Sequence, residues 1–396
     1  MTMIMLAQTA VPKGLVGGPF GSSLVNRDYA DEGVPVIRGT NLGSSPWVSG
    51  EFAFVSQAKY EADLSSNTAL PGDLVFTQRG TLGQVAVVPA QPHQRYVISQ
   101  SQMRLRVDES RFDARFVYYA CSTSEFARQV DDNAIRTGVP HINLGILARL
   151  ELPAPSLKVQ RGIAEVLGAL DDKIAANTRI LDVADEFVRA SYSALKLEGR
   201  EGRKLGALAT NVRAKAAPGS VAPDSVYVGL EHVPRRHLWL VDHGRAGSVT
   251  SDKWHFEPGD VLFGKLRPYF HKVATAAAPG ICSTDILVVR ATDPAISGLV
   301  LAAAADDDTI QATTAATEGT RMPRTSWKDL AVIEVPWPAE VRCREFSSKV
   351  TVVARLANAT VNENSHLTAT RDALLPLLMS GKVTVKDAES VVGEVL

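Results

Sequence analysis

The feature that most constrains how this sequence can fold is an internal repeat at long range. Residues 152–155 (Leu-Pro-Ala-Pro) return 183 positions later as residues 335–338 (Val-Pro-Trp-Pro), and the proline of residues 138–141 recurs at the same offset in residues 321–324. Earlier in each half, residues 71–76 (Pro-Gly-Asp-Leu-Val-Phe) correspond to residues 258–263 (Pro-Gly-Asp-Val-Leu-Phe). Each of these segments predicts a turn followed by a short apolar strand. The chain therefore consists of two related halves.

A long segment with heptad spacing follows each Pro-x-Pro sequence. Apolar residues at alternating steps of four and three predict one face of a helix that packs on a partner helix. The two predicted seams share one register, because Phe346 lies 183 positions after Ile163. The first seam contains Ile163, Leu167, Leu170, Ile174, Leu181, Val188 and Leu195, and the second contains Phe346, Val350, Val353, Leu367, Leu374 and Leu378.

Polar residues interrupt both seams near their middle, at Asn177 in the first and at Thr360 and Asn364 in the second. A buried polar residue at such a position can specify helix register and orientation at a cost in stability. The alternative interpretation is a polar gap that solvent tolerates, and the sequence leaves both open.

The repeat predicts the order domain, helix, domain, helix. The short strands punctuated by Gly and Pro, together with a few helices such as residues 114–131, favour an α+β class for both globular domains. Two long helices with matching seams would most simply pack on each other, and antiparallel pairing would give the chain a pseudo-two-fold axis. The predicted boundaries are 1–155 and 201–337 for the domains, 156–200 and 338–382 for the helices, and 383–396 for a C-terminal tail.

Composition excludes several other classes of protein. The 396 residues include 45% hydrophobic residues, so global disorder is excluded. Three separated cysteines, Cys121, Cys282 and Cys343, cannot form a disulfide framework and favour a reducing cytoplasm. No apolar run approaches the roughly 20 residues of a membrane span, and the first ten residues lack the basic start of a secretory signal.

Motifs for catalysis are absent from the sequence. There is no Pro-Pro dipeptide for a loop that holds a flipped adenine, no phosphate-binding GxxxxGK[ST] and no HExxH zinc motif. Residues 56–59 fit the weak pattern SxxK, and Asp224 with Glu231 faintly resembles a nuclease carboxylate pair. We therefore expect a binding protein that is not an enzyme and that holds neither a cofactor nor a metal.

Several segments together resemble the DNA-specificity (S) subunit of type I restriction-modification systems. Their order and their duplication carry the resemblance, which covers nearly the whole chain. They are residues 18–24 and 33–41 at the start of the first domain, 71–83 at its centre, 152–174 at the start of the first helix and 373–382 at the end of the second. One departure is that the family's Glu-Gln at the start of the helix is Val159-Gln160 here and Arg342-Cys343 in the repeat.

The resemblance implies a complete functional scheme. Each domain would be a target recognition domain that reads one half of a bipartite site in double-stranded DNA, and the helices would form an antiparallel coiled coil that sets the spacing. Two modification (methyltransferase) subunits would dock on the helices, restriction subunits would join a larger complex, and no membrane would be involved. The alternatives are a free-standing DNA-modifying enzyme and a coiled-coil scaffold that does not bind DNA.

Candidate DNA contacts are polar and basic residues on turns after strands, since such residue types bind phosphates and base edges. In the first domain they are Arg38, Thr40, Asn41, Thr77, Gln78, Arg79, Thr81, Ser99, Gln100, Ser101, Arg136, His141 and Asn143. In the second they are Arg235, Arg236, His237, Lys265, Arg267, Tyr269, His271, Ser283, Thr284, Arg321, Arg324, Thr325 and Ser326.

Charge limits what these residues can do alone. Residues 1–156 contain 13 basic and 14 acidic groups, and residues 201–337 contain 15 of each. Because non-specific affinity for DNA comes largely from Lys and Arg against phosphates, we expect the isolated chain to bind DNA weakly.

Overall fold

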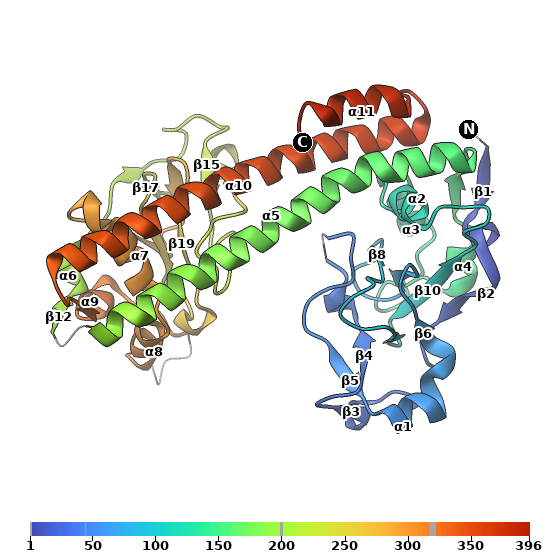
Figure 1. Cartoon of the computed structure of the whole chain (residues 1–396), viewed down its shortest axis with the longest axis horizontal. Coiled ribbons are helices and arrows are strands. Elements are labelled where there is room, and N and C mark those ends of the chain that lie inside the picture. The colour runs from blue at the N-terminus through green and yellow to red at the C-terminus, as the bar shows by residue number, and fades with distance from the viewer. Residues whose placement is uncertain (1, 44, 199–200, 317–321) are drawn as a thin grey trace. The chain divides into compact units, whose positions relative to one another are not determined.

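The chain forms two compact units, each of which combines segments that lie far apart in the sequence. The computed structural model describes residues 2–43, 45–198, 201–316 and 322–396 (Figure 1). The first unit contains Met1–Ala175 and His366–Leu396, and the second contains Ala176–Ser365. Two long helices, α5 (Leu157–Glu198) and α10 (Glu340–Ser380), each contribute to both units.

Two sheets and a small ribbon build the first unit. An antiparallel sheet has the order β2-β10-β7-β8, a mixed sheet has the order β3-β5-β4-β9-β6, and β1 pairs with β11. The strands are β1 (Met3–Met5), β2 (Ala10–Gly17), β3 (Tyr29–Ala30), β4 (Val34–Ile37), β5 (Ala53–Val55), β6 (Thr68–Ala69), β7 (Leu74–Thr77), β8 (Val85–Val87), β9 (Tyr96–Ile98), β10 (Gln102–Val107) and β11 (Glu151–Pro153).

The second unit repeats this plan. Its antiparallel sheet has the order β13-β21-β18-β19, its mixed sheet the order β14-β17-β20-β15-β16, and β12 pairs with β22. The strands are β12 (Gly202–Lys204), β13 (Ala209–Val212), β14 (Lys215–Ala216), β15 (Val226–Val228), β16 (Gly244–Arg245), β17 (Lys253–Phe256), β18 (Val261–Gly264), β19 (Val273–Thr275), β20 (Gly280–Cys282), β21 (Ile286–Ala291) and β22 (Glu334–Pro336). The parallel pair β15–β20 matches β4–β9, and only the edge strands β3 and β14 differ in their place.

Short helices complete each unit. They are α1 (Gln57–Lys59), α2 (Ala114–Cys121), α3 (Ser124–Asp132) and α4 (Leu144–Arg149) in the first, and α6 (Leu205–Leu208), α7 (Ser297–Ala304), α8 (Asp307–Ala315) and α9 (Trp327–Ala331) in the second. The helix expected over residues 114–131 is two helices, so that expectation was wrong in detail. The break falls at Thr123, whose hydroxyl accepts a hydrogen bond from the amide of Phe126 at 3.2 Å and begins α3.

A buried aspartate holds the central turn in both units. After the turn at Gly72, which has φ +86°, Asp73 accepts hydrogen bonds from Nε and Nη2 of Arg106 on β10 at 2.8 and 2.7 Å. In the second unit Gly259 has φ +87°, and Asp260 accepts from Nε and Nη2 of Arg290 at 2.7 and 2.6 Å. A bidentate pair of this kind is directional as well as strong, so it fixes the turn to the neighbouring strand.

Within each unit the two long helices run antiparallel. In the first unit Asp171 of α5 pairs with Arg371 of α10 at 2.7 Å. In the second, Asn177 Nδ2 donates to Asn364 Oδ1 at 2.9 Å, whereas Glu198 near the end of α5 pairs with Arg342 near the start of α10 at 2.7 Å. Position numbers rise along one helix as they fall along the other, so the expected α+β class with antiparallel helices is confirmed.

The structure places the predicted seam residues in the cores of the two units. Ile163, Leu167, Leu170, Leu367, Leu374 and Leu378 are buried in the first, Leu181, Val188, Leu195, Phe346 and Val350 are buried in the second, and Ile174 and Val353 are half-buried. Asn177 is also buried, and its amide donates to both Glu363 and Asn364. The polar position is therefore filled by hydrogen bonds between the helices, as a residue that specifies register would require.

One seam position differs between the units. Arg371 occupies the position that corresponds, 183 residues earlier, to the buried Val188. Its partner Asp171 is 2% exposed and also accepts a hydrogen bond from the hydroxyl of Tyr119 at 2.5 Å. Burial, followed by the charge of Asp171, raises the pKa of Tyr119, so its hydroxyl stays protonated and donates. The first unit thus contains a charged network where the second has apolar packing.

Residues 383–396, expected to be a tail, contain helix α11 (Val385–Gly393) (Figure 1). Gly381, with φ +73°, ends α10, and the side chain of Thr384 begins α11 by accepting a hydrogen bond from the amide of Asp387 at 3.3 Å. Val385 lies against Gly162 of α5, where a Cβ would come within 2.8 Å of it. The segment therefore packs into the core of the first unit.

We predict that Asp260→Ala destabilises the second unit by about 2 kcal/mol, because it removes the acceptor of two charged hydrogen bonds from Arg290 and leaves the amide of Glu257 without its partner. Urea unfolding followed by hydrogen exchange of the β18 amides measures the loss. The matched control is Asp252→Ala, which removes an exposed ion pair with Lys215 and should cost at most about 1 kcal/mol. Equal losses for the two variants would contradict a special role for the buried aspartate.

We also predict that Asp171→Ala costs the first unit about 3–5 kcal/mol, because the charge of Arg371 is left without its buried partner. The triple variant Asp171→Ala, Arg371→Val, Tyr119→Phe should recover most of this loss, since it removes every group that the network must satisfy. Ala and Val are the residues that the repeat has at the matching positions, Ala354 and Val188. Chemical denaturation measures both variants, and a triple variant no more stable than the single one would refute the explanation.

Candidate nucleic-acid interface

In the first unit, backbone hydrogen bonds join four segments that follow strands or precede helix α4. The amide of Ser99 donates to Ile37 O at 2.9 Å, that of Gln78 donates to Ser101 O at 2.7 Å, and that of Ile142 donates to Gln78 O at 3.0 Å. These bonds bring together the first loop cluster, which we define as residues 38–41, 78–83, 99–101 and 135–143.

The second unit contains the same bonds at the matching positions. The amide of Ser283 donates to Val228 O at 2.8 Å, that of Lys265 donates to Asp285 O at 2.8 Å, and that of Thr325 donates to Lys265 O at 3.0 Å. We define the second loop cluster as residues 229–236, 265–271, 283–285 and 322–326. The fold thus presents two loop clusters with one backbone frame.

Four of the candidate DNA contacts are buried. They are Asn41, Thr77, His271 and Thr325. Asn41 accepts from the amide of Arg38 and donates to the carbonyls of Ser49 and Glu51, and Thr77 donates to Gln84 Oε1 at 3.1 Å. Asn41 and Thr77 thus hold the loops in shape, whereas the buried hydroxyl of Thr325 has no hydrogen-bond partner among the described residues. Burial counts against all four as base contacts.

His271 serves the loop in the same way. Its Nε2 lies 2.8 Å from Ala305 O, and burial lowers the pKa of the imidazole, so the neutral ring donates from Nε2. The backbone around it is unusual, because Arg236, Arg267 and His271 all have φ between 51° and 57°. Left-handed non-glycine residues are strained, and they cluster where function requires a particular loop shape.

Other candidates are accessible but already have polar partners. Asn143 begins α4 and Ser326 begins α9, Gln100 donates to the carbonyls of Gly21 and Leu24, and Arg38 and His141 are half-buried. Four further candidates form ion pairs: Arg136 with Asp131, Arg236 with Asp307, Arg324 with Asp285 and His237 with Asp182. These residues need to exchange or share a partner before they contact DNA. Arg321 lies outside the described residues.

A smaller group is exposed and makes no side-chain hydrogen bond or ion pair to another described residue. It comprises Thr40, Arg79 and Thr81 in the first cluster and Arg235, Arg267, Tyr269 and Thr284 in the second. Tyr269 is 50% exposed and belongs to the short helix η7 (Pro268–Phe270), and the Arg235 guanidinium stacks 4.1 Å from the ring centre of Phe270. Exposed aromatic and guanidinium groups together suit stacking on bases and binding of phosphates.

Sequence reasoning missed one part of the second cluster. A cavity of about 290 Å³ opens at the end of β18, and besides Lys265, Thr284 and Arg324 it is lined by Asn211, Arg213 and Trp254. Asn211 lies on β13, Arg213 follows that strand, and Trp254 lies on β17, so a search confined to the loops after the central strands does not reach them. The basic residue directly after a strand, Arg213, was the available signal.

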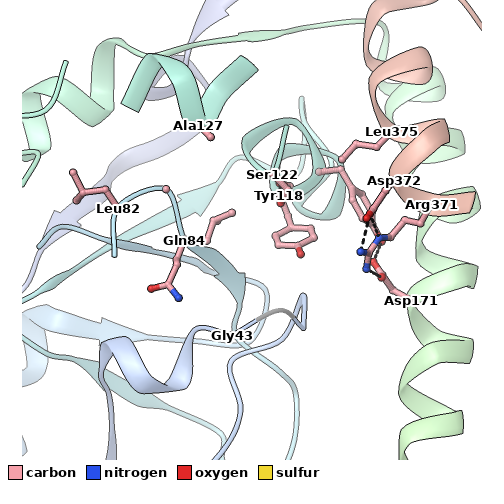
Figure 2. A pocket seen from close by; sticks show the side chains of 13 residues that line it. Gly43, Leu82, Gln84, Tyr118, Ser122, Ala127, Asp171, Arg371, Asp372 and Leu375 are labelled. Carbon is pink, nitrogen blue, oxygen red and sulfur yellow. Dashed lines mark hydrogen bonds and ion pairs between the residues drawn. The ribbon is translucent and has the colours of Figure 1, made fainter. Parts of the chain in front are cut away.

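A larger cavity of about 380 Å³ in the first unit lies between the helices and residues 82–85 (Figure 2). Figure 2 shows Arg371 of α10 turned toward Asp171 of α5, with Asp372 beside it, while Tyr118 of α2 faces the cavity. Because Arg371 is paired with two carboxylates, the wall formed by the helices offers no uncompensated cation. Burial raises the pKa of Tyr118 to about 12, so this hydroxyl stays neutral. The cavity is not suited to binding an anion.

Neither a metal site nor a membrane segment is found in the described part of the chain. Within it, no group of three or more His, Cys, Asp or Glu side chains could hold a metal ion. Of its helices, none combines the length and apolar character needed to cross a membrane. Cys121, Cys282 and Cys343 are buried and free.

Comparison with known proteins finds one matching family and several similar structures. Residues 23–185 match the family described as "Type I restriction modification DNA specificity domain". No curated protein matches the sequence. The chain is similar to the crystal structure of a type I restriction-modification S subunit from M. genitalium, with a TM-score of 0.57, 15% identity and coverage of 95% of both chains. It is also similar, with a TM-score of 0.38, 14% identity and coverage of 96% and 97%, to the HsdS subunit from Thermoanaerobacter tengcongensis. The first likeness shows a shared fold.

Proposed function

We propose that this chain, whose residues 23–185 match the type I restriction modification DNA specificity domain family, is the non-catalytic subunit that gives a restriction-modification complex its DNA specificity. The observation that carries the proposal is the repeated frame of backbone hydrogen bonds, which presents different side chains in the two units: Gln78 and Ser101 in the first correspond to Lys265 and Asp285 in the second. Two such clusters suit a bipartite target with unlike halves.

The exposed side chains divide between two tasks. Arg79 in the first cluster and Arg235 and Arg267 in the second would bind phosphates and set the position of the duplex. Thr40, Thr81 and Thr284 would contact base edges, because a hydroxyl can both donate and accept. Since neither predicted domain has a net positive charge, the partner subunits would supply further phosphate contacts.

The long helices would set the spacing and carry the partners. Ile180, Val183 and Phe187 form one exposed apolar face on α5, where Val183 is 63% exposed, and Val352 and Leu356 are exposed on α10. Five exposed large apolar side chains on one helix pair are more than scattered surface residues require, and they mark a surface that another protein covers. We assign this surface to a methyltransferase subunit, with a second copy on the helix pair of the first unit.

The test is co-expression with a candidate methyltransferase subunit of a type I restriction-modification system from the same genome, followed by mapping of modified bases. Replacing residues 1–150 with those of a relative that has another target should change one half of the site only. The exchange should retain Tyr119, whose hydroxyl donates to Asp171. A change in both halves would contradict independent reading. Methylation by the purified chain alone would instead indicate a free-standing enzyme, and failure of any methyltransferase to co-purify would indicate a scaffold.

A second prediction concerns the spacing. Insertion of one heptad between Ala175 and Ala176, with a second heptad between Ser365 and His366, falls at the boundary between the two units in both helices. Seven helical residues add about 10 Å, which equals about 3 base pairs. We expect a longer gap with unchanged half-sequences in a methylation map. The control inserts the heptad in α5 alone, which should misalign the apolar seams of the two helices and abolish methylation. An unchanged gap in the double insertion would refute the proposed role of the helices as a spacer.

A further inference from the structure

The cavity at the end of β18 in the second unit concentrates cationic side chains around a single carboxylate. Lys265, Arg213 and Arg324 line it together with Asp285 and Thr284. Arg324 Nη2 donates to Asp285 Oδ1 at 2.8 Å, which orients the guanidinium while about half of that side chain stays exposed. The remaining hydrogen-bonding positions of both groups are available to a ligand.

Lys265 is the unusual member of this group. It is half-buried, and its ammonium makes no hydrogen bond or ion pair to another described residue. Burial lowers its pKa, and the charges of Arg324 and Arg213 act in the same direction while Asp285 opposes them. A partly desolvated cation without a partner is unfavourable in the free protein, and it gains when an electron-rich ligand enters.

The first unit has the same frame without these charges. The backbone bonds of Lys265 with Asp285 and Thr325 match those of Gln78 with Ser101 and Ile142. By the same alignment, and by the bridges Arg79–His141 and Leu266–Arg324, Arg324 corresponds to His141. The second unit therefore contains a Lys–Arg–Asp set where the first has Gln, His and Ser, so this position should distinguish the two halves of the target.

We propose that this cavity reads a G·C base pair in the major groove, with Lys265 and Arg324 donating to guanine O6 and N7 and Asp285 accepting from the cytosine N4 amino group. The inference rests on the proposed DNA-reading function and assigns a base pair to it. A G·C pair presents two adjacent acceptors and one donor, which is the complement of this set. A phosphate presents acceptors only and would be repelled by Asp285, whereas an adenine offers the cations one acceptor instead of two.

The experiment uses the complex of this chain with its methyltransferase subunits and a DNA library randomised across the recognition site. The variants Lys265→Gln and Arg324→His introduce the residues of the first unit. Each should reduce the preference for G·C at one position of one half-site by about tenfold or more, and leave the other half unchanged. Lys265→Arg should retain the preference, which shows that the loss comes from the missing cation and not from misfolding.

Two controls locate the effect. Lys215→Gln alters an exposed lysine of the same unit that is ion-paired with Asp252 and does not line the cavity, so it should leave the profile unchanged. Gln78→Ala should alter only the other half-site. Uniform loss of affinity for all sequences, with a smaller salt dependence, would show a phosphate contact and overturn the base-pair assignment.

An unchanged profile in both Lys265→Gln and Arg324→His would also overturn the assignment, as would a wild-type half-site that requires no G·C pair. These outcomes are distinguishable from failure of the proposed function. If the proposed function were wrong, the wild-type complex itself would methylate the library without sequence preference, or would not form.

Discussion

The apolar seam between α5 and α10 is the interaction on which the rest of the structure depends. In the first unit Leu167 and Leu170 of α5 join Leu367 and Leu374 of α10 in one core with the strands of the antiparallel sheet. In the second unit Val188 and Leu195 join Phe346 and Val350 in the equivalent core. A long helix in water gains most of its stability from such an apolar face. The seam therefore stabilises both the helices and the domains that pack on them.

The connectivity of this seam has a consequence for folding. Residues 366–396 belong to the first unit, although the whole second unit precedes them in the chain. Contacts between residues this far apart close a long loop. The loss of chain entropy on closing the loop comes before the contacts can stabilise the fold. Leu170 and Gly162 can pack against Leu367 and Val385 only after those residues, near the end of the chain, have been synthesised. The first unit cannot complete its core until the chain is nearly finished.

The second constraint is that ion pairs of buried aspartates and backbone hydrogen bonds fix the shape of each unit, whereas the exposed loop side chains can vary. The pairs Asp73–Arg106 and Asp260–Arg290 and the repeated backbone bonds involve no exposed loop side chain. Loop residues such as Gln78 and Lys265 can therefore differ without loss of the frame, which is how a rigid scaffold carries variable binding residues. The charged network of Asp171, Arg371 and Tyr119 shows that the helices also differ between the units, at a position where Val188 packs in the second unit.

Much of this architecture followed from the sequence by itself, because the repeat and the heptad spacing are properties of residue order. They predicted two α+β domains, the strands after both Pro-Gly-Asp turns and two paired helices. The sequence expectations missed two short helices: Thr123 divides the helix expected over residues 114–131, and α11 forms where a tail was expected. The caps of α3 and α11 join residues three apart in the sequence, whereas the contact of Val385 with Gly162 depends on neighbours in space. For the same reason only the tertiary structure separated buried Asn41 and His271 from exposed Arg79 and Tyr269, and brought Arg213 beside Lys265. A polar side chain after a strand has the same sequence signature whether it supports a loop or faces a ligand, and only its burial and its hydrogen-bond partners in the tertiary structure decide between them.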